Sequence, residues 1–404
     1  MPDTFAYRVR DRQGSLVTGE IEADSRDLVL RRLREQGFIP LEIKKKSGKL
    51  NTEISFLTRK KIKLKFLSIF SRQFATMINS GLPLLRALAI LEKQTESKEL
   101  ARVIGEVRDD VERGDSLSDA MAKHPKAFSR LYVAMTRAGE VGGVLDQVLL
   151  RLADTLEREV ELRRRIKSAM TYPVVVMVIV GLILTAMLLF VVPSFRELFA
   201  SLGGTLPLPT RILLAISDIF QRFFLFVIAG FGVLIFAVRR YIKTENGRYR
   251  FDKLKLKIPI FGPLFHKTAM SRFARTLGAL SRSGVPLLQS MDIVQETVGN
   301  AVVARAVKDV QEAVKEGESL AAPLARHDVF PPMVVQMLAV GEETGALDTM
   351  LEKISIFYDD EVAATVDALT ALIEPLLIVM VGGTVGLIVI SLYLPMFRIF
   401  DLIG

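Results

Sequence analysis

Two long apolar segments, each bracketed by prolines, constrain the fold of this chain more than any other feature. One runs from Pro173 to Pro193 and the other from Pro375 to Pro395, and nineteen residues without an ionisable side chain separate the prolines in each. A helix needs roughly 20 apolar residues to cross a bilayer core. Helices buried inside a large soluble protein are the alternative, but segments that are apolar on every face are typical of lipid. The sequence therefore predicts transmembrane helices at 173–193 and 375–395.

A third apolar segment lies between them, at 219–238. It contains "FFLFVIAGFGVLIFAV" and reaches spanning length only if it includes Arg222, whose charged end can reach back to the membrane surface. Because the two bracketed spans are copies of each other and run the same way, a returning span is required here. We therefore predict three transmembrane helices.

The distribution of Lys and Arg beside these spans predicts their orientation. Basic residues are concentrated in 158–167 and at the start of 239–267, whereas only two arginines fall in 194–218. Positive charge stays on the cytoplasmic side of a membrane. We therefore expect a cytoplasmic basic linker at 239–267, an external loop at 194–218 and an external tail at 396–404.

Composition narrows the classes of partner and site. The 404 residues are 50% hydrophobic and 25% charged, with a mean hydropathy of +0.33 and a net charge of +9. Such a charge suits anionic lipid or nucleic acid, but no nucleic-acid module with interleaved aromatics accompanies it, so we expect anionic lipid and no nucleic acid. The absence of cysteine excludes disulfides and iron–sulfur clusters.

The proline-bracketed segments are the ends of a longer internal repeat. "SGLPLLRALAIL" at 80–91 recurs as "SGVPLLQSMDIV" at 283–294, a shift of 203 residues, and after the loss of one residue "GVLD" meets "GALD" at a shift of 202. Apolar residues recur at helical spacing throughout both copies. We predict a mainly α protein with two duplicated cytoplasmic six-helix bundles, at 66–172 and 268–374, each continuous with a span.

The first residues have a different pattern. "FAYRVRDRQGSLVTGEIEA" alternates around a turn like a pair of strands, "SRDLVLRRLREQG" is an amphipathic helix, and "FIPLEIKKK" is a further strand candidate. These features predict a small α/β N-terminal head at 1–46. A basic linker at 47–65 would follow it.

No catalytic or metal-binding pattern is present in the sequence. It lacks a phosphate-binding loop of the form G-x-x-x-x-G-K-[ST] and the H-E-x-x-H pattern of zinc enzymes. Carboxylates cluster at 156–161 and 358–362. These clusters are interpreted either as solvated helix faces or as a site that docks a partner or binds a divalent cation. We expect no enzyme activity, no cofactor and no metal.

Several motifs carry a resemblance to a known family. "FSRQFATMINSGLPLLRALAIL", "RAGEVGGVLDQVL" and "AMTYPVVVMV", with their second copies, resemble the type II secretion F family, and the head is similar as well. Within that family, "FPPMVVQMLAVGEETGALDTMLEKISIFYDDEVAATVDALTALIEPLL" and the ending "YLPMF" look most like the inner-membrane platform proteins of type IV pili (PilC-type).

The resemblance implies a function and a set of partners. It implies a non-enzymatic platform in the bacterial inner membrane that couples a cytoplasmic hexameric ATPase to insertion or extraction of pilin subunits. Expected partners are the assembly and retraction ATPases, pilin, other inner-membrane pilus alignment proteins and further copies of the chain. The loop 194–218 and the tail 396–404 would then be periplasmic. Protein F of a type II secretion system, driving pseudopilus assembly, is the alternative, and a small repeat-built transporter is an alternative of another class.

Candidate partner contacts come mostly from residues that the repeat retains in both copies. Glu374, beside Pro375, is the exception, since it is a carboxylate at a membrane boundary. Helix capping and ion pairs within each bundle are the competing interpretation. The candidates are Arg72, Gly139, Glu140, Arg275, Gly341, Glu342, Glu343 and Glu374.

Overall fold

A computed structural model describes residues 3–10, 16–23, 26–35, 38–45, 62–194 and 207–403. The chain divides into two units, Met1–Lys61 and Ile62–Gly404, and each is described by itself. Most of the predicted linker 47–65, and residues 195–206 of the predicted loop, lie outside the described residues.

The first unit contains a three-stranded antiparallel sheet and one helix. Strand β1 (Asp3–Arg10) lies between β2 (Leu16–Ala23) and β3 (Ile39–Lys45), and α1 spans Arg26–Glu35. Ala23, Val29 and Leu33 form its buried cluster. Pro40 lies in β3, an edge strand, where its missing N–H costs no hydrogen bond in the sheet interior.

The second unit begins with a bundle of six helices. They are α2 (Leu64–Asn79), α3 (Leu84–Gln94), α4 (Lys98–Glu112), α5 (Leu117–Ala122), α6 (Arg130–Gly142) and α7 (Leu145–Ala186). Apolar residues at helical spacing meet in one core that contains Phe70, Phe74, Phe128 and Tyr132. The predicted six helices of the first copy are thus present.

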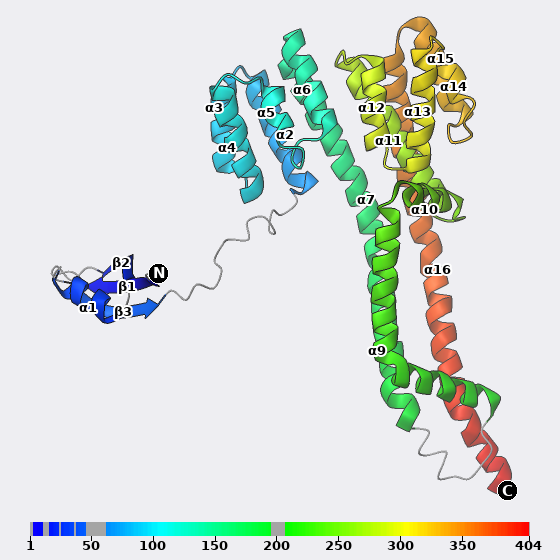
Figure 1. Ribbon diagram of the computed structural model, residues 1–404. Coiled ribbons are helices and arrows are strands. Elements are labelled where there is room, and N and C mark those ends of the chain that lie inside the picture. The colour runs from blue at the N-terminus through cyan, green and yellow to red at the C-terminus, as the bar shows by residue number, and fades with distance from the viewer. Residues whose placement is uncertain are drawn as a thin grey trace. The chain divides into compact units, whose positions relative to one another are not determined.

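A second bundle repeats this order. Its helices are α11 (Gly262–Arg282), α12 (Leu287–Thr297), α13 (Ala301–Lys315), α14 (Ala321–Leu324), α15 (Pro332–Thr344) and α16 (Leu347–Ile403). Phe273 and Phe330 pack in its core with ring centroids 5.2 Å apart. The two bundles lie side by side in Figure 1, and α7 and α16 descend from them.

The last helix of each bundle continues without a break into an apolar segment. Two stretches are long and apolar enough to cross a membrane, Leu145–Ser194 and Leu347–Leu394. Pro173 lies inside α7 and Pro375 inside α16, so neither proline ends its helix. Each removes one backbone donor, which a long helix with intact neighbouring turns tolerates. At the end of the first stretch, Met187–Val191 form a π-helical turn, η1.

Helix α9 (Leu208–Ile242) contains the third predicted span, 219–238. It begins well inside the region predicted as a loop, 194–218, so that prediction is wrong from Leu208 onward. Leu213 and Leu214, in the first turns of α9, are buried against Val192 and Leu392. This packing makes the first turns of α9 part of the folded structure.

Hydrogen bonds join α9 to both other long helices. The Ser217 and Gln221 side chains donate to the carbonyls of Leu188 and Leu189 in η1, at 2.6 and 3.2 Å, and Thr210 donates to the Ser391 carbonyl at 2.5 Å. A π-helical turn loosens its own backbone carbonyls, which are then free to accept such donors. The first turns of α9 lie across α16 in Figure 1.

The predicted linker 239–267 is also wrong, because the structure has ordered helix there. Helix α10 (Glu245–Lys257) packs on α11 and α13, and α11 already begins at Gly262. The buried Asp252 carboxylate accepts a hydrogen bond from the Ala301 backbone N–H at 2.9 Å and pairs with Lys255. The many basic residues of α10 indicated a linker, but this one buried acid attaches the helix to α13.

We expect Asp252→Ala to release α10 from the second bundle. The change leaves the partly buried Ala301 N–H without its carboxylate partner, which costs about 1–3 kcal/mol at most. Hydrogen exchange measured by mass spectrometry should show faster amide exchange in 245–257. Glu245→Ala, at the exposed first turn of the same helix, serves as the control, and equal exchange in the two variants would contradict the assignment.

Candidate functional site

The retained arginines tie the first helix of each bundle to its last helix. The Arg72 guanidinium donates to both carboxylate oxygens of Glu157, at 2.8 and 2.6 Å, and also pairs with Asp154. In the second copy Arg275 pairs with Asp359, which is the equivalent of Glu157 at a shift of 202. The repeat therefore preserves an ion pair between α2 and α7, and between α11 and α16.

The retained glutamates cap short helices. The Glu140 carboxylate accepts hydrogen bonds from the Leu117 and Ser118 N–H groups at 2.5 and 3.0 Å, at the start of α5. Glu342 accepts from Leu320 and Ala321 at the start of α14, at distances from 2.8 to 3.3 Å. A carboxylate at this position satisfies helix-terminal N–H groups and complements the positive end of the helix dipole.

The retained glycines allow the last two helices of each bundle to approach closely. A Cβ at Gly139 would lie 3.0 Å from the Val148 side chain, and one at Gly341 would lie 3.0 Å from the Leu347 Cα. Neither space admits a methyl group without movement of the neighbouring helix. The glycines thus fix the tight turns from α6 to α7 and from α15 to α16.

The other two candidates lie on the surface. Glu343 and Glu374 are exposed, and neither makes a hydrogen bond or ion pair with any residue in the described part of the chain. Six of the eight candidates therefore have contacts inside the protein, and these two present a free carboxylate. A role of any of the eight in binding a partner remains a prediction.

The clustered carboxylates pair with basic side chains. Glu159 accepts from Arg163 and Arg272, Glu161 pairs with Arg164 and Arg165, and Glu361 pairs with Lys267. Within the described ranges, no three acidic or histidine side chains are placed to hold a metal ion together. These carboxylates act as ion-pair partners in the structure.

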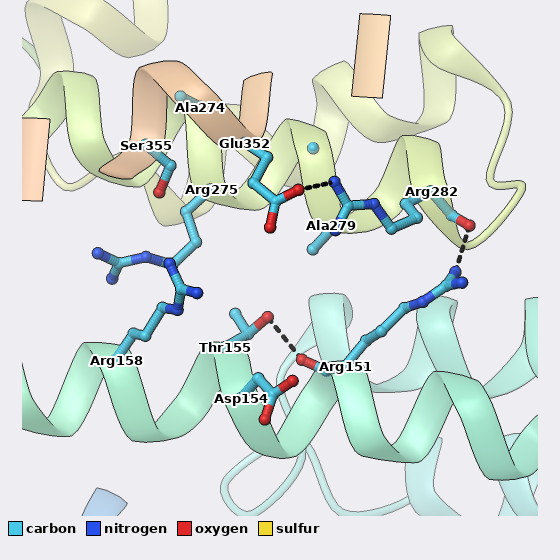
Figure 2. A pocket seen from close by; sticks show the side chains of 11 residues that line it. Arg151, Asp154, Thr155, Arg158, Ala274, Arg275, Ala279, Arg282, Glu352 and Ser355 are labelled. Atoms are coloured by element: carbon cyan, nitrogen blue, oxygen red, sulfur yellow. Dashed lines mark hydrogen bonds and ion pairs between the residues drawn. The ribbon is translucent and has the colours of Figure 1, made fainter. Parts of the chain in front are cut away.

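A polar joint connects the two bundles, and most of its residues were not among the sequence candidates. Glu159 of α7 reaches Arg272 and Arg275 of α11, at 2.9 and 3.4 Å, and Arg151 donates to the Arg282 carbonyl. Figure 2 shows the cavity of about 90 Å³ that these elements enclose. Of its lining, only Arg275 was a candidate. The repeat gave no signal for Asp154, Arg158, Arg282 and Glu352, because the equivalent position in the other copy lacks the same charge, and Arg151 is matched only by a lysine, Lys353.

Comparison with known proteins covers both copies and the head. The family described as "Type II secretion system (T2SS), protein F" matches residues 70–193 and 273–395, and its N-terminal domain matches residues 1–44. The chain belongs to the type II secretion system protein F family. Each matched repeat of the F family corresponds to one bundle with its attached apolar helix, and the head corresponds to the F family's N-terminal domain.

Relatives within the F family have two kinds of name. A "Type IV pilus assembly protein PilC" of Thermus thermophilus is 47% identical over 397 residues, which cover 98% of both chains. Another of that name, from Myxococcus xanthus, is 41% identical over 395 residues, 98% of this chain and 94% of the relative. A "Type II secretion system protein F" of Xanthomonas campestris is 36% identical over 402 residues and 99% of each chain. The chain thus falls in the type IV pilus PilC branch of the F family.

The ion pairs between first and last helices predict how stability depends on pH. Hydrogen bonding to Arg72 lowers the pKa of Glu157, and hydrogen bonding to Arg282 lowers the pKa of Glu352. A lowered pKa stabilises the fold above the unfolded-state value of about 4.3, and this contribution is lost as the pH falls through the folded-state value. The effect is modest, since both carboxylates are over two-fifths exposed.

We therefore expect the melting temperature to fall as the pH drops below about 4.3. Arg72→Ala and Arg282→Ala should lower it at neutral pH and make the acid decline shallower, as measured by differential scanning fluorimetry of the detergent-solubilised protein. Arg86→Ala, on the exposed side of α3, should keep the original profile. A decline of unchanged steepness in both variants would contradict the pairing.

Proposed function

We propose that the chain is the inner-membrane platform of a type IV pilus assembly machine. The single observation that carries the proposal is the duplicated unit in which a rigid bundle continues as one helix into an apolar segment. Relatives named type IV pilus assembly protein PilC match over nearly the whole chain and support the same reading. The chain would act without chemistry of its own, as a coupling element between a cytoplasmic hexameric ATPase and pilin subunits in the membrane.

The proposed platform has three transmembrane helices. The apolar parts of α7 and α16 would run outward, and the part of α9 that follows its first turns would return the chain. Support comes from the hydrogen bonds of Ser217, Gln221 and Thr210 to the backbone of the other two helices, since polar side chains in a bilayer need such partners. The head and both bundles would be cytoplasmic, with 195–206 and the C-terminal end in the periplasm, and anionic lipid would contact the basic α10.

The ATPase would contact the turns that lie farthest from the membrane. The turn from α6 to α7 and the turn from α15 to α16 lie at the opposite ends of those helices from the apolar segments, about 42 Å along α7 from Pro173. Val141 in the first turn is 86% exposed, and Glu343 in the second has a free carboxylate. An exposed apolar side chain next to tightly fixed glycine turns is a suitable contact for a moving partner.

The proposal predicts that deletion of the gene abolishes surface pili. The purified protein should co-isolate with the motor ATPase and show no ATPase activity alone. Val141→Asp and Glu343→Lys together should keep the wild-type melting temperature but weaken co-isolation, because they change only the exposed turns. Glu316→Lys, exposed at the end of α13, is the charge control.

Normal piliation of the deletion strain would refute the pilus role. If the same strain instead lost secreted proteins from its medium, the alternative would hold, in which the chain is protein F of a type II secretion system. Relatives of that name, at 36% identity in Xanthomonas campestris, are the observation that keeps this alternative open.

Self-association is a further part of the proposed function, and the repeat indicates the surface. In the second bundle Leu280, Val285 and Ile293 are buried, and they belong to the core cluster of the first bundle. Their equivalents at a shift of 203, Met77, Leu82 and Ile90, are only partly buried. An apolar surface that is covered in one copy is thus open in the other.

The open surface includes a groove of about 500 Å³ along α2 and the turn that follows it. Met77 and Leu82 line it together with Arg72, at one end of the bundle. If the contact between the two bundles of one chain were repeated between two chains, α16 of a second copy would fill this groove. On that helix Ile356 and Phe357 are 36% and 43% exposed, and the acidic Asp360 lies beside them. Apolar surface and opposite charge match across this contact. Since its two faces differ, it would join copies head to tail into a ring.

Disulfide trapping tests this contact cleanly, because the chain has no cysteine. Mixing membranes that contain a Leu82→Cys protein with those that contain a Phe357→Cys protein, followed by detergent exchange and mild oxidation, should give a cross-linked dimer. A Gln94→Cys protein, altered at an exposed position on α3 outside the groove, should not cross-link with the Phe357→Cys protein. Equal yields from the two mixtures would contradict the proposed interface.

A further inference from the structure

The cavity at the joint between the bundles has more positive than negative charge. It has a volume of about 90 Å³ and lies between α7 of the first bundle and α11 and α16 of the second. Its charged lining residues are Arg151, Arg158, Arg275, Arg282, Asp154 and Glu352. Four guanidinium groups thus face two carboxylates, and Figure 2 shows Arg158 and Arg275 extending toward each other from opposite sides.

The two carboxylates are already engaged. Glu352 accepts a hydrogen bond from Arg282 at 2.5 Å, and Asp154 pairs with Arg72, which lies outside the cavity. Arg158 makes no hydrogen bond or ion pair with any residue that the structure describes, although its charge helps to lower the pKa of Glu352. The Arg158 guanidinium, which faces that of Arg275, thus has carboxylates in its neighbourhood but, among the described residues, none in direct contact.

Two buried donors in the lining also lack acceptors. Arg275 is 7% exposed, and its terminal nitrogens bond to Ser271, Asp359 and Glu159, but its Nε–H has no partner. Ser355 is 3% exposed and its hydroxyl has no partner either. Each unsatisfied group costs about 1–3 kcal/mol. Water could accept these hydrogen bonds, but it would bring no negative charge into contact with Arg158.

We propose that this cavity binds a phosphate-class oxyanion, either inorganic phosphate or the terminal phosphate of a soluble ligand. The Arg275 Nε–H and the Ser355 hydroxyl donate to its oxygens, and Arg158 supplies the opposite charge. Arg158 lies about 22 Å along α7 from Pro173, so lipid headgroups do not reach the site. The anion joins a side chain of the first bundle to two of the second, and thereby holds the bundles together.

The test uses the full chain in an uncharged detergent. Inorganic phosphate and ADP are each titrated at constant ionic strength with chloride as the balancing anion, and thermal unfolding and isothermal titration calorimetry are recorded. Either ligand should raise the melting temperature above that in chloride alone. Arg158→Gln should weaken binding by about tenfold or more, because a charge-assisted contact is lost. Arg164→Gln, which removes the same charge outside the cavity, should bind like the wild type.

Ser355→Ala distinguishes a ligand site from a merely structural residue. Without phosphate the variant should be as stable as the wild type or more so, since a buried hydroxyl without a partner is removed. With phosphate it should gain less stability than the wild type. The proposal would be overturned if neither phosphate nor ADP stabilised the protein more than chloride does. It would also be overturned if phosphate stabilised Arg158→Gln and Ser355→Ala as strongly as it stabilises the wild type.

Discussion

One continuous helix joins each bundle to its apolar segment, and the rest of the structure depends on it. Helix α7 runs for 42 residues from Leu145 and α16 for 57 residues from Leu347. The ion pairs of Arg72 with Glu157 and of Arg275 with Asp359 hold the first helix of each bundle against this long one. Since a helix resists bending between its supports, a proposed rotation of either bundle would be carried along its length.

The sequence predicted the features that are repeated or uniformly apolar. The shift of 203 and then 202 residues located both bundles, and the retained Arg72, Glu140 and Gly139 have equivalents with the same contacts in the second copy. Their roles were less predictable. Retention in both copies fits a partner contact and an internal ion pair equally well, and only the geometry reveals the helix caps and the close helix approach.

Features that depend on one contact between residues far apart in the sequence were not predicted. Helix α10 resembles a basic linker because its surface is charged, whereas the buried Asp252 that fixes it is one residue among many. The first turns of α9 fall in the predicted loop 194–218, and the sequence does not indicate a helix there because the packing partners, Val192 and Leu392, lie far away in sequence. The joint residue Arg158 has no counterpart of the same charge in the second copy, where Asp360 occupies the equivalent position, so the repeat could not reveal it.

The contact between the bundles changes in character along α7. Close to the apolar segments it is a dry cluster, in which Leu162 packs against Val362, Val366 and Leu369. Farther from them it becomes the charged joint around Arg158 and Glu159. Apolar packing keeps two helices together without fixing their angle through directional bonds, whereas ion pairs can exchange partners. Further apolar contact between the bundles comes from Leu280, Val285 and Ile293, which belong to the core cluster of the first bundle. An anion in the joint would add a polar link to these apolar contacts, because it bonds to both bundles when Arg158, Arg275 and Ser355 converge on it.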